Sequence, residues 1–205
     1  MLDLDRALAD ITAIRSQLAR GSAYRVYGPA TIGATGLLAF LAAGAQTIVA
    51  PDPAAAIYDY LGLWIGAAVL AVGLVGIEMI ARSKRLHTGL ADEVIHAAIE
   101  QFIPAGVAGV MLTIVLLQFA PQNLWMLPGL WQIVFSLGVF ASCRALPRPM
   151  FAVGVWYLAA GLVSLALSSG AEAFSPWIMG LPFGVGQLLM AVVFIRNSEA
   201  ADGEA

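Results

Sequence analysis

Long uncharged apolar stretches alternate with short polar segments along this chain of 205 residues. Six of the stretches contain about 20 residues each, which is the length a helix needs to cross ~30 Å of hydrocarbon. They run over residues 26–49, 58–81, 98–119, 123–143, 150–168 and 174–195. The pattern predicts an all-α, polytopic membrane protein whose transmembrane domain, residues 23–196, is a bundle of six transmembrane helices.

The positive charges show which segments share a side of the membrane. All ten Lys and Arg residues lie before the first stretch or after the second, fourth or sixth. With six spans these segments all face the same side, and positively charged segments stay in the cytoplasm. We therefore expect a multi-pass protein of the bacterial inner membrane with both termini in the cytoplasm. The connections on the other side carry only acids, Asp52, Asp59 and Glu172.

Composition agrees with a membrane location and excludes a nucleic-acid partner. Apolar residues make up 60% of the chain and charged residues 11%, against roughly 25% charged in a typical soluble domain. A formal net charge of −3 leaves no basic surface for a nucleic acid. The lipid bilayer is the expected surrounding, and a cytoplasmic or membrane protein is an expected partner. Glycines four residues apart, such as Gly62 and Gly66, would also allow a homodimer.

Polar segments flank the spans. Residues 1–22 are predicted to form an amphipathic cytoplasmic helix, because apolar residues recur there every three or four positions and Gly21 can end the helix. A second cytoplasmic element, the 82–96 elbow, leads into the third span. Residues 197–205 have no large apolar side chain, and we expect a disordered tail there.

The elbow and the start of the third span contain the densest group of ionisable side chains, Asp92, Glu93, His96 and Glu100. Spacings of three and four place them on one helical face, where they could sense pH or bind a metal. A di-iron centre would need a second Glu-x-x-His pair, and the spans contain none. A solvated, salt-bridged surface is the favoured interpretation, and we expect no cofactor.

Glu78 is the one acid clearly inside a predicted span. It lies in the last turn of that span, and Arg82 follows four residues later, an order that favours an ion pair. An interfacial salt bridge between Glu78 and Arg82 is therefore predicted in preference to a proton-coupling site.

Uncharged polar residues within the spans indicate a different use of the bundle. Trp131, Gln132 and Ser136 lie in the fourth span, and Gln187 lies in the sixth beside several glycines. Together they could line a pocket for a neutral solute. Interhelical hydrogen bonds, worth ~0.6 kcal/mol each in membranes, would explain them as well.

Some segments repeat within the chain, and others resemble a known family. Residues 61–64 (LGLW) resemble residues 128–131 (PGLW), which indicates either duplication of a two-span hairpin or coincidence in an apolar sequence. Residues 86–92 (LHTGLAD), 127–132 (LPGLWQ) and 154–158 (GVWYL) resemble an uncharacterised six-span inner-membrane protein family of proteobacteria. The layout is also loosely similar to bacterial acid-resistance membrane proteins built from hairpin repeats. These resemblances imply a six-span fold and transfer no catalytic or binding residue.

Catalytic motifs are missing from the sequence, which has no phosphate-binding loop, nucleophile elbow or Cys-x-x-Cys pair. We therefore expect a non-catalytic interaction or regulatory module, and not an enzyme. It would present residues 1–22 and the 82–96 elbow to the cytoplasm. The alternative is a small-solute transporter or a solute-binding membrane subunit.

Overall fold

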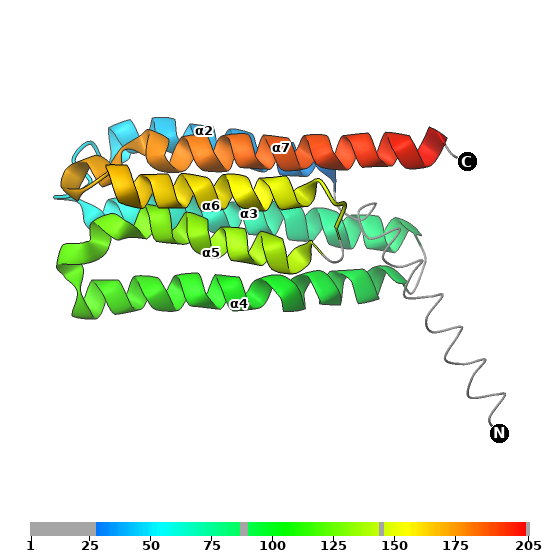
Figure 1. Cartoon of the computed structure of the whole chain (residues 1–205), viewed down its shortest axis with the longest axis horizontal. Helices are drawn as coiled ribbons and strands as arrows, with labels where there is room; N and C mark the ends of the chain where they lie inside the picture. The colour runs from blue at the N-terminus through cyan, green and yellow to red at the C-terminus, as the bar shows by residue number, and fades with distance from the viewer. Residues whose placement is uncertain (1–27, 87–89, 144–145, 204–205) are drawn as a thin grey trace, which may run out of the picture.

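The structure is a computed structural model that describes residues 28–86, 90–143 and 146–203. The helix predicted over residues 1–22 lies outside this part of the chain. The described elements are α2 (Pro29–Val49), α3 (Ile57–Leu86), α4 (Leu90–Phe119), the 3-10 helix η1 (Pro121–Met126), α5 (Leu127–Ser142), α6 (Met150–Leu167), the 3-10 helix η2 (Gly170–Phe174) and α7 (Pro176–Gly203). The long helices run roughly along one axis as a bundle (Figure 1).

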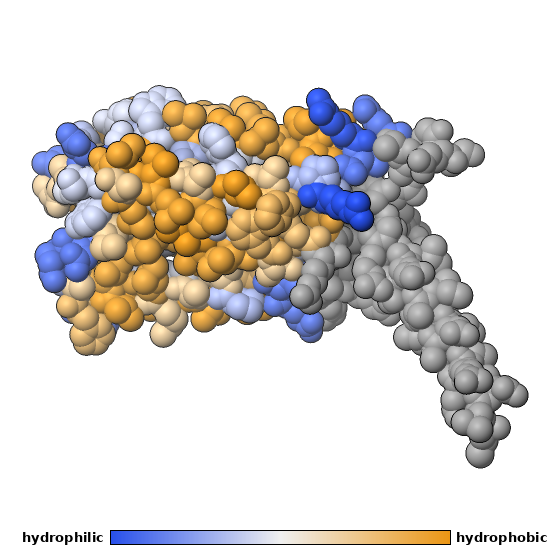
Figure 2. All heavy atoms as spheres, viewed as in Figure 1, coloured by the Kyte–Doolittle hydropathy of each residue, from blue (hydrophilic) through white to orange (hydrophobic). Residues whose placement is uncertain are grey.

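Six segments are long and apolar enough to cross a membrane, so the predicted all-α, six-helix architecture is confirmed. They are Pro29–Val49, Ile57–Arg82, Glu100–Phe119, Pro121–Ser142, Met150–Leu167 and Gly170–Glu199. Between the two ends of the bundle the visible surface is mainly apolar (Figure 2). A helix satisfies its own backbone hydrogen bonds, which is why long apolar runs adopt this form in lipid.

The C-terminal end differs from the prediction. α7 continues to Gly203, so residues 197–203 are helical, whereas a disordered tail was expected from residue 197 onward. The Asn197 amide donates to the Val193 carbonyl at 2.8 Å, and the Ser198 hydroxyl donates to the Ile195 carbonyl at 2.7 Å. Alanine and glutamate in this stretch are good helix formers. A helix that is already nucleated can therefore continue through a segment whose composition alone indicates disorder.

The two ends of the bundle differ in charge. At one end the connection after α2, η1 and η2 come together (Figure 1). Its charged residues are Asp52, Asp59 and Glu172, and no Lys, Arg or His lies in these segments. We name it the acidic end. The opposite end, toward which α3, α5 and α7 run, includes Arg82, Arg148 and Arg196, and we name it the basic end.

Glycines bring two pairs of helices into close contact. α2 packs mainly against α7, and α5 packs mainly against α6. A Cβ added to Gly36 of α2 would lie 2.9 Å from the Gly184 carbonyl oxygen of α7. A Cβ on Gly161 of α6 would lie 2.7 Å from the Gly129 carbonyl oxygen of α5. Small residues at such crossings let membrane helices approach closely and gain packing energy.

Aromatic side chains fill part of the core of the bundle. The Tyr157 ring, which is fully buried, lies 4.6 Å from the Phe135 ring and 5.3 Å from the Phe183 ring, between centroids. Phe102 stands edge-on to Phe135 at 5.3 Å. These contacts join α4, α5, α6 and α7, and tilted or edge-on pairs of this kind stabilise a core beyond their buried area.

Candidate functional site

Gln132 was predicted from the sequence to line a solute pocket or to bond another helix, and it makes an interhelical bond. Its side chain is fully buried, and its Nε2 donates to the carbonyl of Ile178 in α7 at 2.7 Å. Pro182 lies inside α7 and has no N–H to bond the carbonyl four residues before it. That carbonyl belongs to Ile178. Gln132 therefore supplies the donor that Pro182 cannot.

The other residues of the predicted solute pocket bond in different directions. The Trp131 indole N–H donates to the Thr113 hydroxyl of α4 at 2.9 Å. The fully buried Ser136 hydroxyl donates to the Ile133 carbonyl of its own helix at 2.6 Å. Gln187 is half-buried where α7 faces α2. Trp131 and Gln132 thus bond to different neighbouring helices.

Gln46 forms a junction that the sequence analysis did not single out. The side chain is fully buried, and its Nε2 donates to the Phe174 carbonyl at 2.6 Å. Its Oε1 accepts from the Trp64 indole N–H at 2.8 Å. One amide therefore joins α2, α3 and η2. The available signal was a glutamine within an apolar span, because such a group needs a partner in lipid.

The two indole bonds repeat along the chain. Trp64 and Trp131 end the two similar segments LGLW and PGLW, and each donates to a polar side chain 18 residues earlier, Gln46 or Thr113. Each bond joins the two helices of one hairpin, α2–α3 or α4–α5. The shared contact supports the hairpin repeat over coincidence.

Three buried polar atoms in the described part of the chain lack a hydrogen-bond partner. They are the Tyr60 hydroxyl, the Tyr157 hydroxyl and Gln132 Oε1. The Gln187 side chain lies near the Tyr157 hydroxyl but forms no hydrogen bond with it. An unpaired buried polar atom costs free energy, so these atoms are the chemically unsatisfied points of the interior.

Glu78 and Arg82 form an ion pair of the predicted spacing. The Arg82 Nε lies 2.5 Å from the Glu78 Oε1, and the two side chains are 40% and 32% exposed, respectively. The pair packs against Gly28, just before α2, where an added Cβ would lie 2.8 Å from the same Oε1. Exposure of this degree keeps the pair's contribution to stability to ~1 kcal/mol or less.

Most side chains of the predicted pH-sensing or metal-binding group lie outside the described part of the structure. Asp92, Glu93 and His96 belong to α4, but only their backbone is described, and Glu100 is exposed. Among the residues that are described, no group of three or more His, Cys, Asp or Glu side chains could hold a metal ion.

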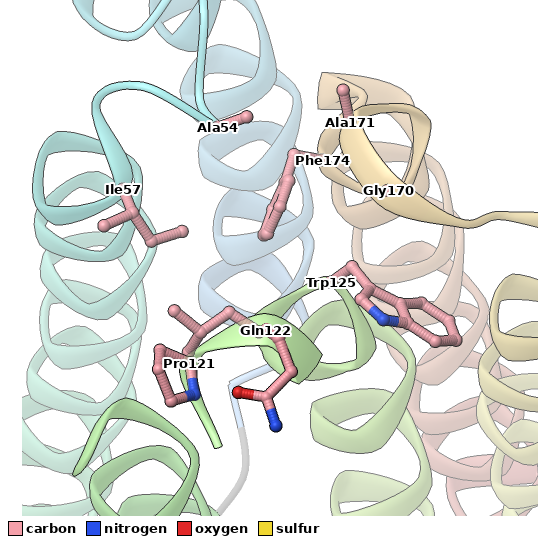
Figure 3. Close-up of a pocket in the computed structure, with 9 residues that line it drawn as sticks. Ala54, Ile57, Pro121, Gln122, Trp125, Gly170, Ala171 and Phe174 are labelled. Carbon is pink, nitrogen blue, oxygen red and sulfur yellow. The ribbon is translucent and has the colours of Figure 1, made fainter. Parts of the chain in front are cut away.

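A hollow of about 250 Å³ opens at the acidic end. Its walls come from the three connections, and Figure 3 shows the rings of Trp125 and Phe174 among them. The lining residues are Ala54, Ile57, Pro121, Gln122, Leu124, Trp125, Gly170, Ala171 and Phe174. Trp131, Gln132, Ser136 and Gln187 do not line it. We name it the acidic-end hollow. Its walls are far apart in the sequence, so no local pattern predicts it.

The fold defines the class of this protein, which is a multi-pass α-helical membrane protein with six apolar helices. No protein-family model, curated protein or solved structure matches the chain. The resemblance to the proteobacterial six-span family stays a prediction.

Proposed function

We propose that this protein is a non-catalytic interaction or regulatory module of the bacterial inner membrane, with both termini, residues 1–22 and the 82–96 elbow in the cytoplasm. One observation carries the proposal: both glutamines that are fully buried in the described bundle bond to neighbouring elements. They are Gln46 and Gln132. A route for a solute would need such groups to face water or substrate. The bundle therefore suits a scaffold whose ionisable groups lie at its ends.

A face of α3 supports a partner within the membrane. The four glycines on α3 have open space around them, because a Cβ added to any of them would meet nothing within 4 Å. They are Gly62, Gly66, Gly73 and Gly76. Small-residue faces of this kind allow close approach of another helix in lipid. A membrane protein partner or a second copy of the chain would fit this face.

Crosslinking in native membranes tests the cytoplasmic part of the proposal. We expect deletion of residues 1–22 to remove at least one crosslinked partner and to change the cellular phenotype, because that segment presents the interaction surface. A variant with Thr47→Ala, which changes an exposed hydroxyl at the acidic end, is the control. An unchanged set of adducts together with an unchanged phenotype would contradict the proposal.

The membrane part is tested by single cysteines in a Cys143→Ser background. A cysteine at Gly73 should form crosslinked adducts with a bifunctional thiol reagent, since it lies on the open face of α3. A cysteine at Val163, which is 53% exposed on α6, is the matched control. Equal crosslinking at the two positions would show that exposure to lipid alone explains the adducts.

A solute-binding or transport function is the second candidate, and one observation favours it. Gln132 Oε1 and the Tyr157 hydroxyl are buried without partners, so a bound polar solute could satisfy them. A screen for solutes that raise the unfolding temperature of the purified protein tests this. A Gln187→Leu variant that keeps the full response would reject the pocket formed by Trp131, Gln132, Ser136 and Gln187.

A further inference from the structure

We propose that the acidic-end hollow binds the apolar group of a small organic cation, whose positive charge stays at the rim among the carboxylates of that end. This adds a small-molecule site to the proposed function and does not depend on it.

The size and lining of the hollow define the apolar part of the ligand. At about 250 Å³ it is slightly smaller than the ~300–1,000 Å³ of pockets that hold drug-sized ligands. It therefore has room for one ring or a short branched alkyl group. Trp125 and Phe174 provide aromatic surface in the wall (Figure 3). Aromatic faces attract cations as well as apolar groups, and tryptophan does so most strongly.

Phe174 gives the hollow a fixed wall. The residue is 5% exposed, and its ring stands edge-on to the Tyr60 ring at 5.1 Å between centroids. Its carbonyl accepts the hydrogen bond from Gln46. Both contacts hold η2 in place, so the hollow exists before a ligand arrives and little ordering cost is added on binding.

The charge around the hollow defines the other part of the ligand. Each of two walls has an acid next to it in the sequence: Asp59 follows Ile57 by two residues, and Glu172 directly follows Ala171. Asp52 precedes the lining residue Ala54 by two. All three acids are exposed, and among the described residues one hydrogen bond reaches their side chains, from the Ala55 N–H to Asp52 Oδ1 at 3.3 Å.

Among the side chains that the structure describes, no cation balances these carboxylates, because Arg82, Arg148 and Arg196 all lie at the basic end. A concave apolar surface with carboxylates of one sign around it raises the local concentration of cations and repels anions. A neutral apolar occupant, such as the end of a lipid chain, would make no use of this charge.

Three ligands of similar size distinguish the contribution of charge to binding from that of apolar contact. They are phenethylammonium, neutral 2-phenylethanol and anionic 3-phenylpropionate. Their binding to the purified full chain in uncharged detergent is measured by calorimetry or ligand-observed NMR. Three carboxylates, each ~10 Å from the ligand's positive charge in water, would give the cation about an eightfold higher affinity than the alcohol. We expect this advantage at about 0.01 M salt and its loss at about 1 M salt, where the screening length falls from ~30 Å to ~3 Å. The anion should bind most weakly.

Variants then assign the site. Asp59→Asn combined with Glu172→Gln should remove most of the preference for the cation at low salt while leaving binding of the alcohol unchanged. Glu199→Gln, which changes an exposed acid far along α7, is the charge control and should keep the preference. Asp59, Glu172 and Glu199 are all exposed, so we expect their variants to fold like the native chain and their binding to be comparable.

A second pair of variants tests the aromatic wall. Trp125→Leu should weaken binding of all three ligands. Trp177→Leu removes an indole that is 56% exposed at the same end and does not line the hollow, so it should leave binding unchanged. Equal binding of the cation and the alcohol at low salt would overturn the proposal, as would no binding of any ligand. A preference that survives the double carboxylate variant would also overturn it.

Discussion

Gln132→Leu tests whether the buried amide compensates for Pro182. The variant removes the bond from Nε2 to the Ile178 carbonyl and leaves that carbonyl unpaired in the interior. An interhelical hydrogen bond in a membrane protein contributes ~0.6 kcal/mol on average and ~1.7 kcal/mol at most. A carbonyl left unpaired costs ~1–3 kcal/mol. The variant also removes the unpaired Oε1, which offsets part of this loss. We therefore expect the free energy of unfolding to fall by ~1–2 kcal/mol.

The second half of the test is Pro182→Ala. An alanine at 182 restores an N–H that can bond the Ile178 carbonyl within α7. In that background Gln132→Leu leaves no unpaired carbonyl, so it should lower the free energy of unfolding clearly less than it does in the native chain. The double-mutant cycle should show a coupling of ~1 kcal/mol between positions 132 and 182.

Reversible unfolding by SDS titration in mixed micelles measures all four proteins of the cycle. Ser136→Ala is the matched control, since Ser136 is also fully buried on α5 but bonds only within its own helix. It should show no coupling to Pro182→Ala. Effects of Gln132→Leu and Pro182→Ala that add to within ~0.3 kcal/mol would refute the compensation.

Three further predictions concern other parts of the bundle. Gln46→Leu should lower the free energy of unfolding by ~2 kcal/mol in the same assay, because the Trp64 N–H and a backbone carbonyl lose their partner, and Thr47→Ala should change it little. Gly161→Ala should destabilise by ~1–3 kcal/mol, since the added Cβ meets backbone 2.7 Å away, whereas Gly73→Ala has open space and should be neutral or slightly stabilising. A phosphatase reporter that is active only in the periplasm should be inactive when fused after Arg196, and activity there would contradict the predicted orientation.

Most of the fold follows from local features of the sequence. Each span is a mainly apolar run, and lipid forces such a run to satisfy its backbone hydrogen bonds as a helix. The Glu78–Arg82 pair follows from a spacing of four on one helix. Both predictions can be made without knowing which helices are neighbours.

The roles of the interior polar groups depend on neighbours and could not be predicted in the same way. Gln132 and its acceptor Ile178 are 46 residues apart, and Gln46 and Phe174 are 128 residues apart. The sequence shows that such amides need partners but not which helix provides them. The prediction of disorder beyond Arg196 was wrong for a different reason. Residues 197–203 lack the apolar side chains by which a helix is recognised in the sequence, but they include residues that readily continue a helix.

Gln46 connects the interior of the bundle to the acidic-end hollow. Its amide holds the Phe174 carbonyl, and the Phe174 ring is part of the wall of the hollow. In the second hairpin the corresponding acceptor, Thr113, donates instead to the Gly109 carbonyl of its own helix, so that hairpin has no matching link to a connection. Of the two acceptors, only Gln46 therefore links its hairpin to a connection, and that link supports the wall of the hollow. A substitution at Gln46 should affect both stability and the hollow, whereas one at Thr113 should affect stability alone.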